Sequence, residues 1–174
     1  MDTIARNGVT TGCGGGNYCP DVSVTRAQMA VFLLGAEHGS SYTPPKCTPP
    51  GIFGDVACPG AFAVNWIEQL YHEGITGGCS ASPLLYCPNA SVTRAQMAVF
   101  LLKAAHGSGY TPPMCAGLFN DVPCPTGFAV DWIEEVFHEG VTAGCSTSPP
   151  LYCPNDPNTR GQMAVFLTKT FSLH

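Results

Sequence analysis

Apolar residues recur at helical spacing in one kind of segment that occurs twice. They lie at i, i+3, i+4 and i+7, while Glu68, Gln69 and Glu73 fall on the opposite side. The apolar positions are Ala63, Trp66, Ile67 and Leu70 in one copy and Ala129, Trp132, Ile133 and Val136 in the other. Gly74 and Gly140 stand where a left-handed residue ends a helix. The pattern therefore predicts two amphipathic helices that bury their apolar faces.

A second kind of segment occurs three times. It opens with Thr-Arg-Ala-Gln at 25–28 and 93–96 and with Thr-Arg-Gly-Gln at 159–162. A threonine N-cap with glutamine three residues later is a capping box, in which side chains and backbone amides satisfy one another. The predicted core positions that follow are Met29, Phe32, Leu33 and Ala36, and Met97, Phe100, Leu101 and Ala104. His38-Gly39 and His106-Gly107 are expected to end these helices.

The same elements return 66 residues apart, as Cys79 and Cys145 show. We expect a partial repeat at 1–50, whose first helix is truncated, and repeats at 51–116 and 117–174. Each unit alone would be marginally stable, so the units should share a core. The chain is predicted to be mainly α, with helix-loop-helix repeats joined by loops rich in glycine and proline.

The ten cysteines sort into neighbours without remainder. Three pairs fall at matching places in the repeats and two bracket the junctions between repeats. The predicted disulfides are Cys13–Cys19, Cys79–Cys87, Cys145–Cys153, Cys47–Cys58 and Cys115–Cys124. The alternative is a thiolate metal site, but the chain has no Cys-x-x-Cys pair, so we expect no metal and no cofactor. Five disulfides indicate an extracellular protein.

Charge and hydropathy disfavour two kinds of binding partner, nucleic acid and membranes. The net charge is −5 and the seven lysines and arginines are scattered singly, which disfavours nucleic acid. The longest apolar run, Met97 to Leu102, has six residues, so no membrane insertion is expected. Met1-Asp-Thr-Ile-Ala-Arg does not resemble a signal peptide. We interpret the sequence as a piece of a longer exported protein.

Five ordered elements resemble the S-layer homology (SLH) domain: Phe-x-Asp-Val, an amphipathic helix, Gly-(Ile/Val)-Thr-x-Gly, an aromatic-x-Pro and Val-Thr-Arg-Ala-Gln. The resemblance covers essentially the whole chain. It implies a pseudo-threefold arrangement of repeats, and a bacterial surface module that binds envelope polysaccharide, often pyruvylated, in grooves between repeats. Phe62 and Phe128 stand where the family has tryptophan, and glutamine replaces the glutamate of the motif. The cysteines indicate a disulfide-bearing variant.

The resemblance implies a set of glycan contacts. These are Arg26, Arg94, Arg160, Gln28, Gln96, Gln162, Phe62 and Phe128. A carboxylate-bearing sugar suits an arginine at a helix start, and we expect a groove at Arg94 helped by Arg26 or Arg160. Each arginine could instead be solvated, or paired with Asp55, Asp121 or a glutamate of the first helix. Trp66 and Trp132 are more consistent with core packing than with sugar stacking.

The expected function is a non-catalytic anchor that attaches its parent protein to envelope polysaccharide. No combination of residues typical of catalysis stands out from the repeat, so we do not expect an enzyme. The alternative is a structural protein that assembles with copies of itself. In the partial repeat, Met29, Phe32 and Leu33 should need a partner helix, yet only Met1 to Asn7 precede them. We therefore expect upstream residues of the parent, or a second copy, to cover that face.

Overall fold

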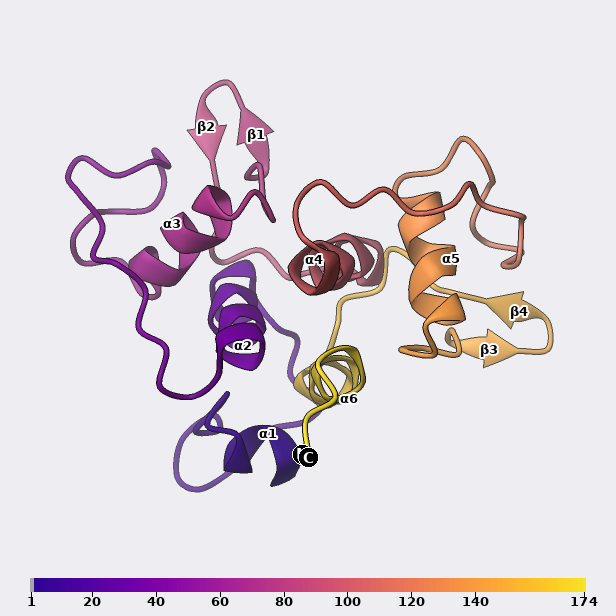
Figure 1. The fold of residues 1–174 in the computed structure, drawn as a ribbon, viewed down its shortest axis with the longest axis horizontal. Coiled ribbons are helices and arrows are strands. Elements are labelled where there is room, and N and C mark those ends of the chain that lie inside the picture. The colour runs from indigo at the N-terminus through magenta and orange to yellow at the C-terminus, as the bar shows by residue number, and fades with distance from the viewer. Residues whose placement is uncertain (1) are drawn as a thin grey trace.

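The computed structural model describes residues 2–174, and helices dominate its regular structure (Figure 1). The helices are α1 (Asp2–Arg6), α2 (Arg26–His38), α3 (Val64–His72), α4 (Arg94–His106), α5 (Val130–His138) and α6 (Arg160–Thr170). The strands are β1 (Ser80–Ala81), β2 (Leu84–Leu85), β3 (Ser146–Thr147) and β4 (Pro150–Leu151). They form two antiparallel hairpins, with Ser80 opposite Leu85 and Ser146 opposite Leu151. The expected mainly α fold is confirmed.

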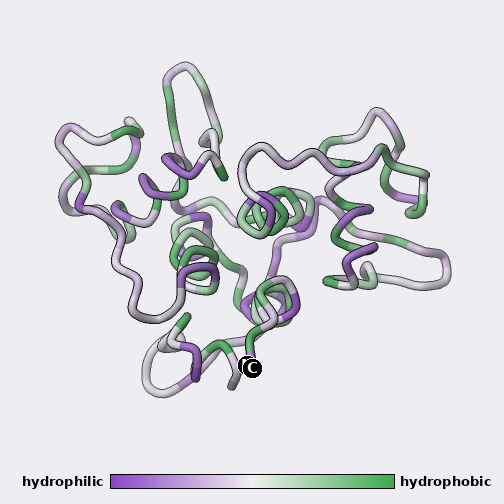
Figure 2. The backbone as a smooth tube through the Cα atoms, in the orientation of Figure 1, coloured by the Kyte–Doolittle hydropathy of each residue, from purple (hydrophilic) through white to green (hydrophobic). Residues whose placement is uncertain are grey.

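Three helices, α2, α4 and α6, lie at the centre and contact one another (Figure 1). Each begins with one copy of the Thr-Arg motif, and all three capping boxes form. Figure 2 shows hydrophobic residues along these helices. In α2, Ala30 and Leu34 are buried as well as Met29, so more than one side of the helix is covered. A helix that is apolar on nearly all sides belongs in an interior. No described helix has the length and apolarity needed to cross a membrane.

The remaining helices pack around this centre, each on a central helix of a different repeat. α3 of the second repeat packs on α2 of the first, α5 of the third packs on α4 of the second, and the short α1 packs on α6. Met29, Phe32 and Leu33 are all buried. The expectation that they would need upstream residues or a second copy is therefore wrong, because the partner of α2 comes from the following repeat.

Backbone hydrogen bonds join the segments that precede the three central helices. The Val24 amide donates to the Asn158 carbonyl at 2.8 Å, the Asn158 amide donates to Val92 at 2.8 Å, and the Val92 amide donates to Val24 at 3.0 Å. The three residues stand two positions before the three motif arginines, and all are fully buried. These bonds close a ring that links the starts of all three central helices.

All five predicted disulfides are confirmed, since each cysteine is bonded to its expected neighbour. The helix boundaries also agree with the sequence pattern, and Gly74 and Gly140 have φ values of 71° after α3 and α5. Bridges this short restrict the unfolded chain by about 2–3 kcal/mol each in the loop-entropy model. They therefore stabilise the irregular loops in which they lie.

Glu68 corrects one prediction, because it is buried rather than solvent-facing. Its Oε1 accepts from the Ile52 amide at 3.0 Å, at the entrance to the second repeat. Glu134, its counterpart in α5, accepts from the amides of Ala116, Gly117 and Leu118. A carboxylate with such donors can be buried at little cost. These glutamates tie the entry loops to the outer helices.

Candidate glycan-binding grooves

The three motif arginines are buried and join neighbouring repeats. The Arg26 Nε donates to the Tyr86 carbonyl at 2.7 Å, and the Tyr86 hydroxyl donates back to the Arg26 carbonyl at 2.8 Å. The same exchange joins Arg94 to Tyr152. For Arg160 and Tyr18, 142 positions apart, the two distances are 2.8 and 2.7 Å. Each arginine therefore connects one repeat to the next, and the third connection closes the cycle.

Aromatic rings enclose the guanidinium groups. The Arg26 guanidinium carbon lies 4.8 Å from the centre of the Tyr86 ring and 5.5 Å from that of Phe100. Such contacts favour the cation, but burial still lowers the pKa of Arg26, opposed by Tyr86 and Asp55. Burial also raises the pKa of the Tyr152 hydroxyl to about 12, against the effect of Arg94. The arginines thus place positive charge in a largely apolar interior.

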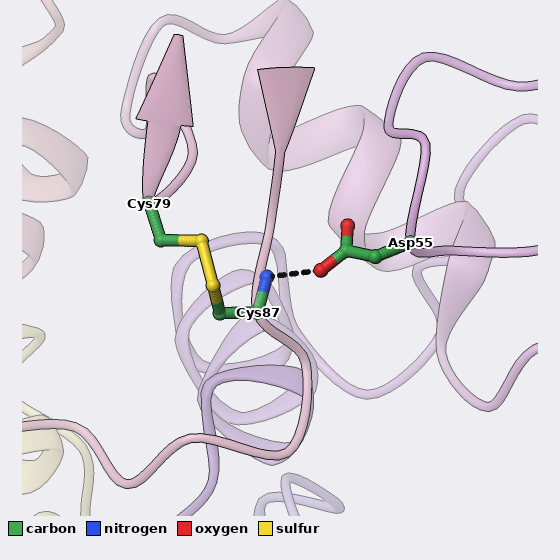
Figure 3. Close-up of side chains that lie close together, drawn as sticks. All are labelled: Asp55, Cys79 and Cys87. Atoms are coloured by element: carbon green, nitrogen blue, oxygen red, sulfur yellow. Dashed lines mark hydrogen bonds between the residues drawn. A yellow bond between two sulfur atoms is a disulfide. The ribbon is translucent and has the colours of Figure 1, made fainter. Parts of the chain in front are cut away.

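Asp55 and Asp121 each accept hydrogen bonds from two backbone amides, and Asp55 acts on Arg26 only through its charge. Asp55 accepts from the Tyr86 amide at 2.8 Å and from the Cys87 amide at 2.7 Å. Figure 3 shows the second of these bonds beside the Cys79–Cys87 disulfide. Asp121 makes the equivalent pair of bonds in the third repeat. Since the neighbouring cysteines are oxidised, this cluster of an acid and two sulfurs lacks the thiolates that a metal site would need.

One groove, here the Arg160 groove, has a volume of about 540 Å³. It is lined by residues of all three repeats, among them Arg160, Thr10, Gln28, Phe32, Phe62 and Trp66. Phe62 is 68% exposed, so its ring is accessible to a ligand. The groove therefore combines an accessible aromatic ring with a buried cation in its lining.

The second groove, here the Arg26 groove, has a volume of about 330 Å³ and the corresponding composition. Its lining includes Arg26, Thr76, Gln96, Phe100, Lys103 and Phe128, again from three repeats. Phe128 is 69% exposed. Neither groove has an aspartate or glutamate among its described lining residues. Both volumes fall in the range typical of small-ligand sites.

The structure brings together six of the eight predicted contact residues, three in each groove. Arg160, Gln28 and Phe62 share one groove, and Arg26, Gln96 and Phe128 share the other. Arg94 and Gln162 line neither. We expected a groove at Arg94, helped by Arg26 or Arg160. Each of these two grooves instead contains one motif arginine, and neither contains Arg94.

The tryptophans are packed against the core and remain partly exposed. Trp66 meets Tyr42 edge-on with ring centres 5.8 Å apart, and Trp132 meets Tyr110 in the same way. Trp66 also lines the Arg160 groove. Core packing was thus the correct expectation for both, and Trp66 has a groove-facing role in addition.

The partners of the arginines were not identified from the sequence. Tyr18, Tyr86 and Tyr152 each precede a Cys-Pro pair, and this recurrence was available as a signal. Thr10 and Thr142 also contact the arginines, at 3.3 Å from Arg160 Nη2 and 3.5 Å from Arg94 Nη2. Recurrence alone could not show which repeat supplies the partner, because that depends on the packing of the repeats.

A further cluster of ionisable groups joins the ends of α2 and α3. The His38 Nε2 lies 3.0 Å from Glu73 Oε1 and 4.0 Å from Glu37 Oε2. Burial, with a contribution from Glu73, raises the pKa of Glu37 to about 7, while His38 opposes the shift. In the next repeat His106 contacts Glu139, but Ala105 stands in place of Glu37. We therefore expect the α2–α3 contact to depend on pH.

No protein-family model matches the chain, and no curated protein matches it. The proposed function therefore rests on the residues that line the two grooves.

Proposed function

We propose that this chain is a non-catalytic, SLH-like module of the bacterial cell surface that attaches its parent protein to envelope polysaccharide. The observation that carries the proposal is the composition of the two grooves. Each combines one motif arginine, one motif glutamine and one exposed phenylalanine, and each residue comes from a different repeat. These are the positions at which the SLH resemblance implies glycan contacts.

The chemistry of the grooves suits sugars. An exposed aromatic ring can stack on the apolar face of a sugar ring while hydroxyl groups reach polar neighbours. The buried guanidinium provides positive charge that attracts an acidic substituent. Stacking and charge attraction hold a ligand without covalent chemistry, which suits a non-catalytic module. A polymer that enters both grooves would be held at two points, which increases its apparent affinity.

A pseudo-threefold arrangement of SLH-type repeats is part of the proposal. It is supported by the closed ring of backbone bonds between Val24, Val92 and Asn158. The cyclic order of the arginine–tyrosine pairs supports it as well. In this arrangement the grooves lie between repeats, as the resemblance implies. Five disulfides fit the oxidising conditions outside the cell.

Sedimentation with purified bacterial wall fragments tests the proposal. We expect the protein to sediment with intact fragments and to stay in solution after their polysaccharide has been removed chemically. Equal sedimentation with both preparations would show that polysaccharide is not the ligand. Formation of large species at increasing protein concentration, without any sugar, would instead favour the self-assembling structural protein.

A further inference from the structure

The two grooves differ in charge although they occupy equivalent places. Lys103 lines the Arg26 groove, and its Nζ donates to the Gly74 carbonyl at 3.3 Å. In α6, Lys169 makes the same contact with Gly140 at 2.8 Å. The equivalent position in α2 is Gly35, which has no charge. The Arg26 groove thus has a second cation that the Arg160 groove lacks.

The buried arginines also differ in their hydrogen bonding. The Arg160 Nη2 donates to Thr10 Oγ1 at 3.3 Å. The Arg26 Nη2 is buried without a hydrogen-bond partner among the described residues, and the whole residue is only 4% exposed. A buried cation with an unsatisfied donor is stabilised strongly by a nearby anion, because the local dielectric constant is low.

The Arg160 groove has fewer charged and more aromatic side chains in its lining than the Arg26 groove. It is larger, and Trp66 contributes to its wall beside the exposed Phe62, while Arg160 is its one charged lining residue among those described. Two accessible aromatic side chains favour contact with the apolar face of a sugar, and this contact does not depend on charge.

From these differences we infer that the two grooves select different sugars: the Arg26 groove takes an acidic, carboxylate-bearing residue, and the Arg160 groove takes an uncharged one. The inference rests on the proposed polysaccharide-binding function and specifies it. A polymer in which acidic and neutral residues alternate would then fit both grooves in one register only. Lys103 is the side chain that distinguishes the grooves, and Gly35 is its uncharged counterpart.

Amide NMR titration with two matched probes tests the inference. Methyl glucuronide and methyl glucoside share a ring and differ in the carboxylate. We expect the glucuronide to shift Gly77 and Gly78 of the Arg26 groove, with an affinity there about tenfold higher than at the Arg160 groove. Gly12 reports on the Arg160 groove and should respond to both probes. Raising the salt concentration should weaken the glucuronide shifts at Gly77 and Gly78 most.

Two reciprocal variants test whether Lys103 causes the difference in glucuronide affinity between the two grooves. Lys103→Ala should lower the glucuronide affinity of the Arg26 groove about tenfold, and Gly35→Lys should raise that of the Arg160 groove. A Cβ at Gly35 would lie 3.8 Å from the Val9 backbone, an ordinary contact, so a side chain can begin there without a backbone clash. Thermal melting of each variant confirms that it is folded.

Equal glucuronide affinity in the two grooves, unchanged binding by Lys103→Ala, or no shift in either groove would each overturn the inference. The proposed function has a separate readout, which is sedimentation of the unmodified protein with wall fragments. Retention on walls together with equivalent grooves would reject the inference and leave the function intact. Absence of retention of the unmodified protein on wall fragments would reject both the inference and the proposed function.

Discussion

Arg26 and Tyr86 hold each other through two hydrogen bonds that run in opposite directions. The side chain of each donates to the main-chain carbonyl of the other, at 2.7 and 2.8 Å, and the guanidinium lies over the tyrosine ring. Because Arg26 belongs to the first repeat and Tyr86 to the second, this pair joins two repeats, and its arginine also lines a groove. The motif arginine therefore has a structural role that a purely ligand-binding interpretation overlooks.

Replacement of Arg94 should reduce stability. Arg94→Ala should lower the free energy of unfolding, because Arg94 is 3% exposed and bonded to Tyr152. Loss of a buried charged hydrogen bond costs about 1.5–3 kcal/mol, and lost packing adds to it. Arg94→Lys should restore only part, because a lysine ammonium cannot reproduce the planar guanidinium contacts. Urea unfolding of both variants measures this, and an unchanged midpoint for Arg94→Ala would contradict the role assigned to the pair.

Glu37 should make the protein less stable as the pH rises. Its pKa is about 7 in the folded chain against an ordinary value of 4.5, so the folded state binds the proton more tightly. Stability from this group is complete below about pH 4.5 and is lost as the pH rises through about 7. After allowance for solvent screening, the loss is roughly 1 kcal/mol.

Glu37→Gln tests this dependence on pH. The variant should match the unmodified protein near pH 5 and be more stable by roughly 1 kcal/mol near pH 8. Position 105 provides a control, since the second repeat has alanine there, and Ala105→Gln should show no such difference between the two pH values. A constant difference between Glu37→Gln and the unmodified protein at both pH values would show that Glu37 does not titrate in this range.

Glu134 should contribute more to stability than its counterpart Glu68. Glu134 accepts from three backbone amides, whereas the bonds of Glu68 include one, from Ile52. An amide side chain has only one acceptor oxygen, so Glu134→Gln leaves part-buried backbone donors without their partner, at a cost of about 2 kcal/mol. Glu68→Gln should cost about 1 kcal/mol. Thermal melts of the two variants decide this, and equal losses would contradict the assigned bonding.

The sequence was most informative where the signal is local. The capping box from Thr25 to Gln28 and the Cys79–Cys87 bridge involve residues a few positions apart, and both form as predicted. The partner of α2 could not be inferred in this way. The periodicity of Met29, Phe32 and Leu33 shows that the face must be buried, but not that α3 of the next repeat covers it.

In the candidate site, too, the motif residues could be predicted from the sequence, but the packing that brings them together could not. The SLH resemblance identified Gln28, Phe62 and Arg160 as candidate contacts, and the packing of three repeats places them in one groove. Glu68 was misassigned to the solvent side because helical periodicity takes no account of the entry loop, which packs against it from outside the helix. Charged residues are predicted to be exposed by default, and backbone donors from a distant loop are what overturn that default.

The exposed phenylalanines provide the most direct test of the central claim, which is that the grooves bind envelope polysaccharide. Phe62→Ala and Phe128→Ala combined should lower wall-fragment affinity on the order of tenfold or more, with little change in melting temperature because both rings are largely exposed. Met114→Ala, at a side chain 82% exposed outside both grooves, is the matched control and should bind normally. Full wall retention by the double variant would contradict the account.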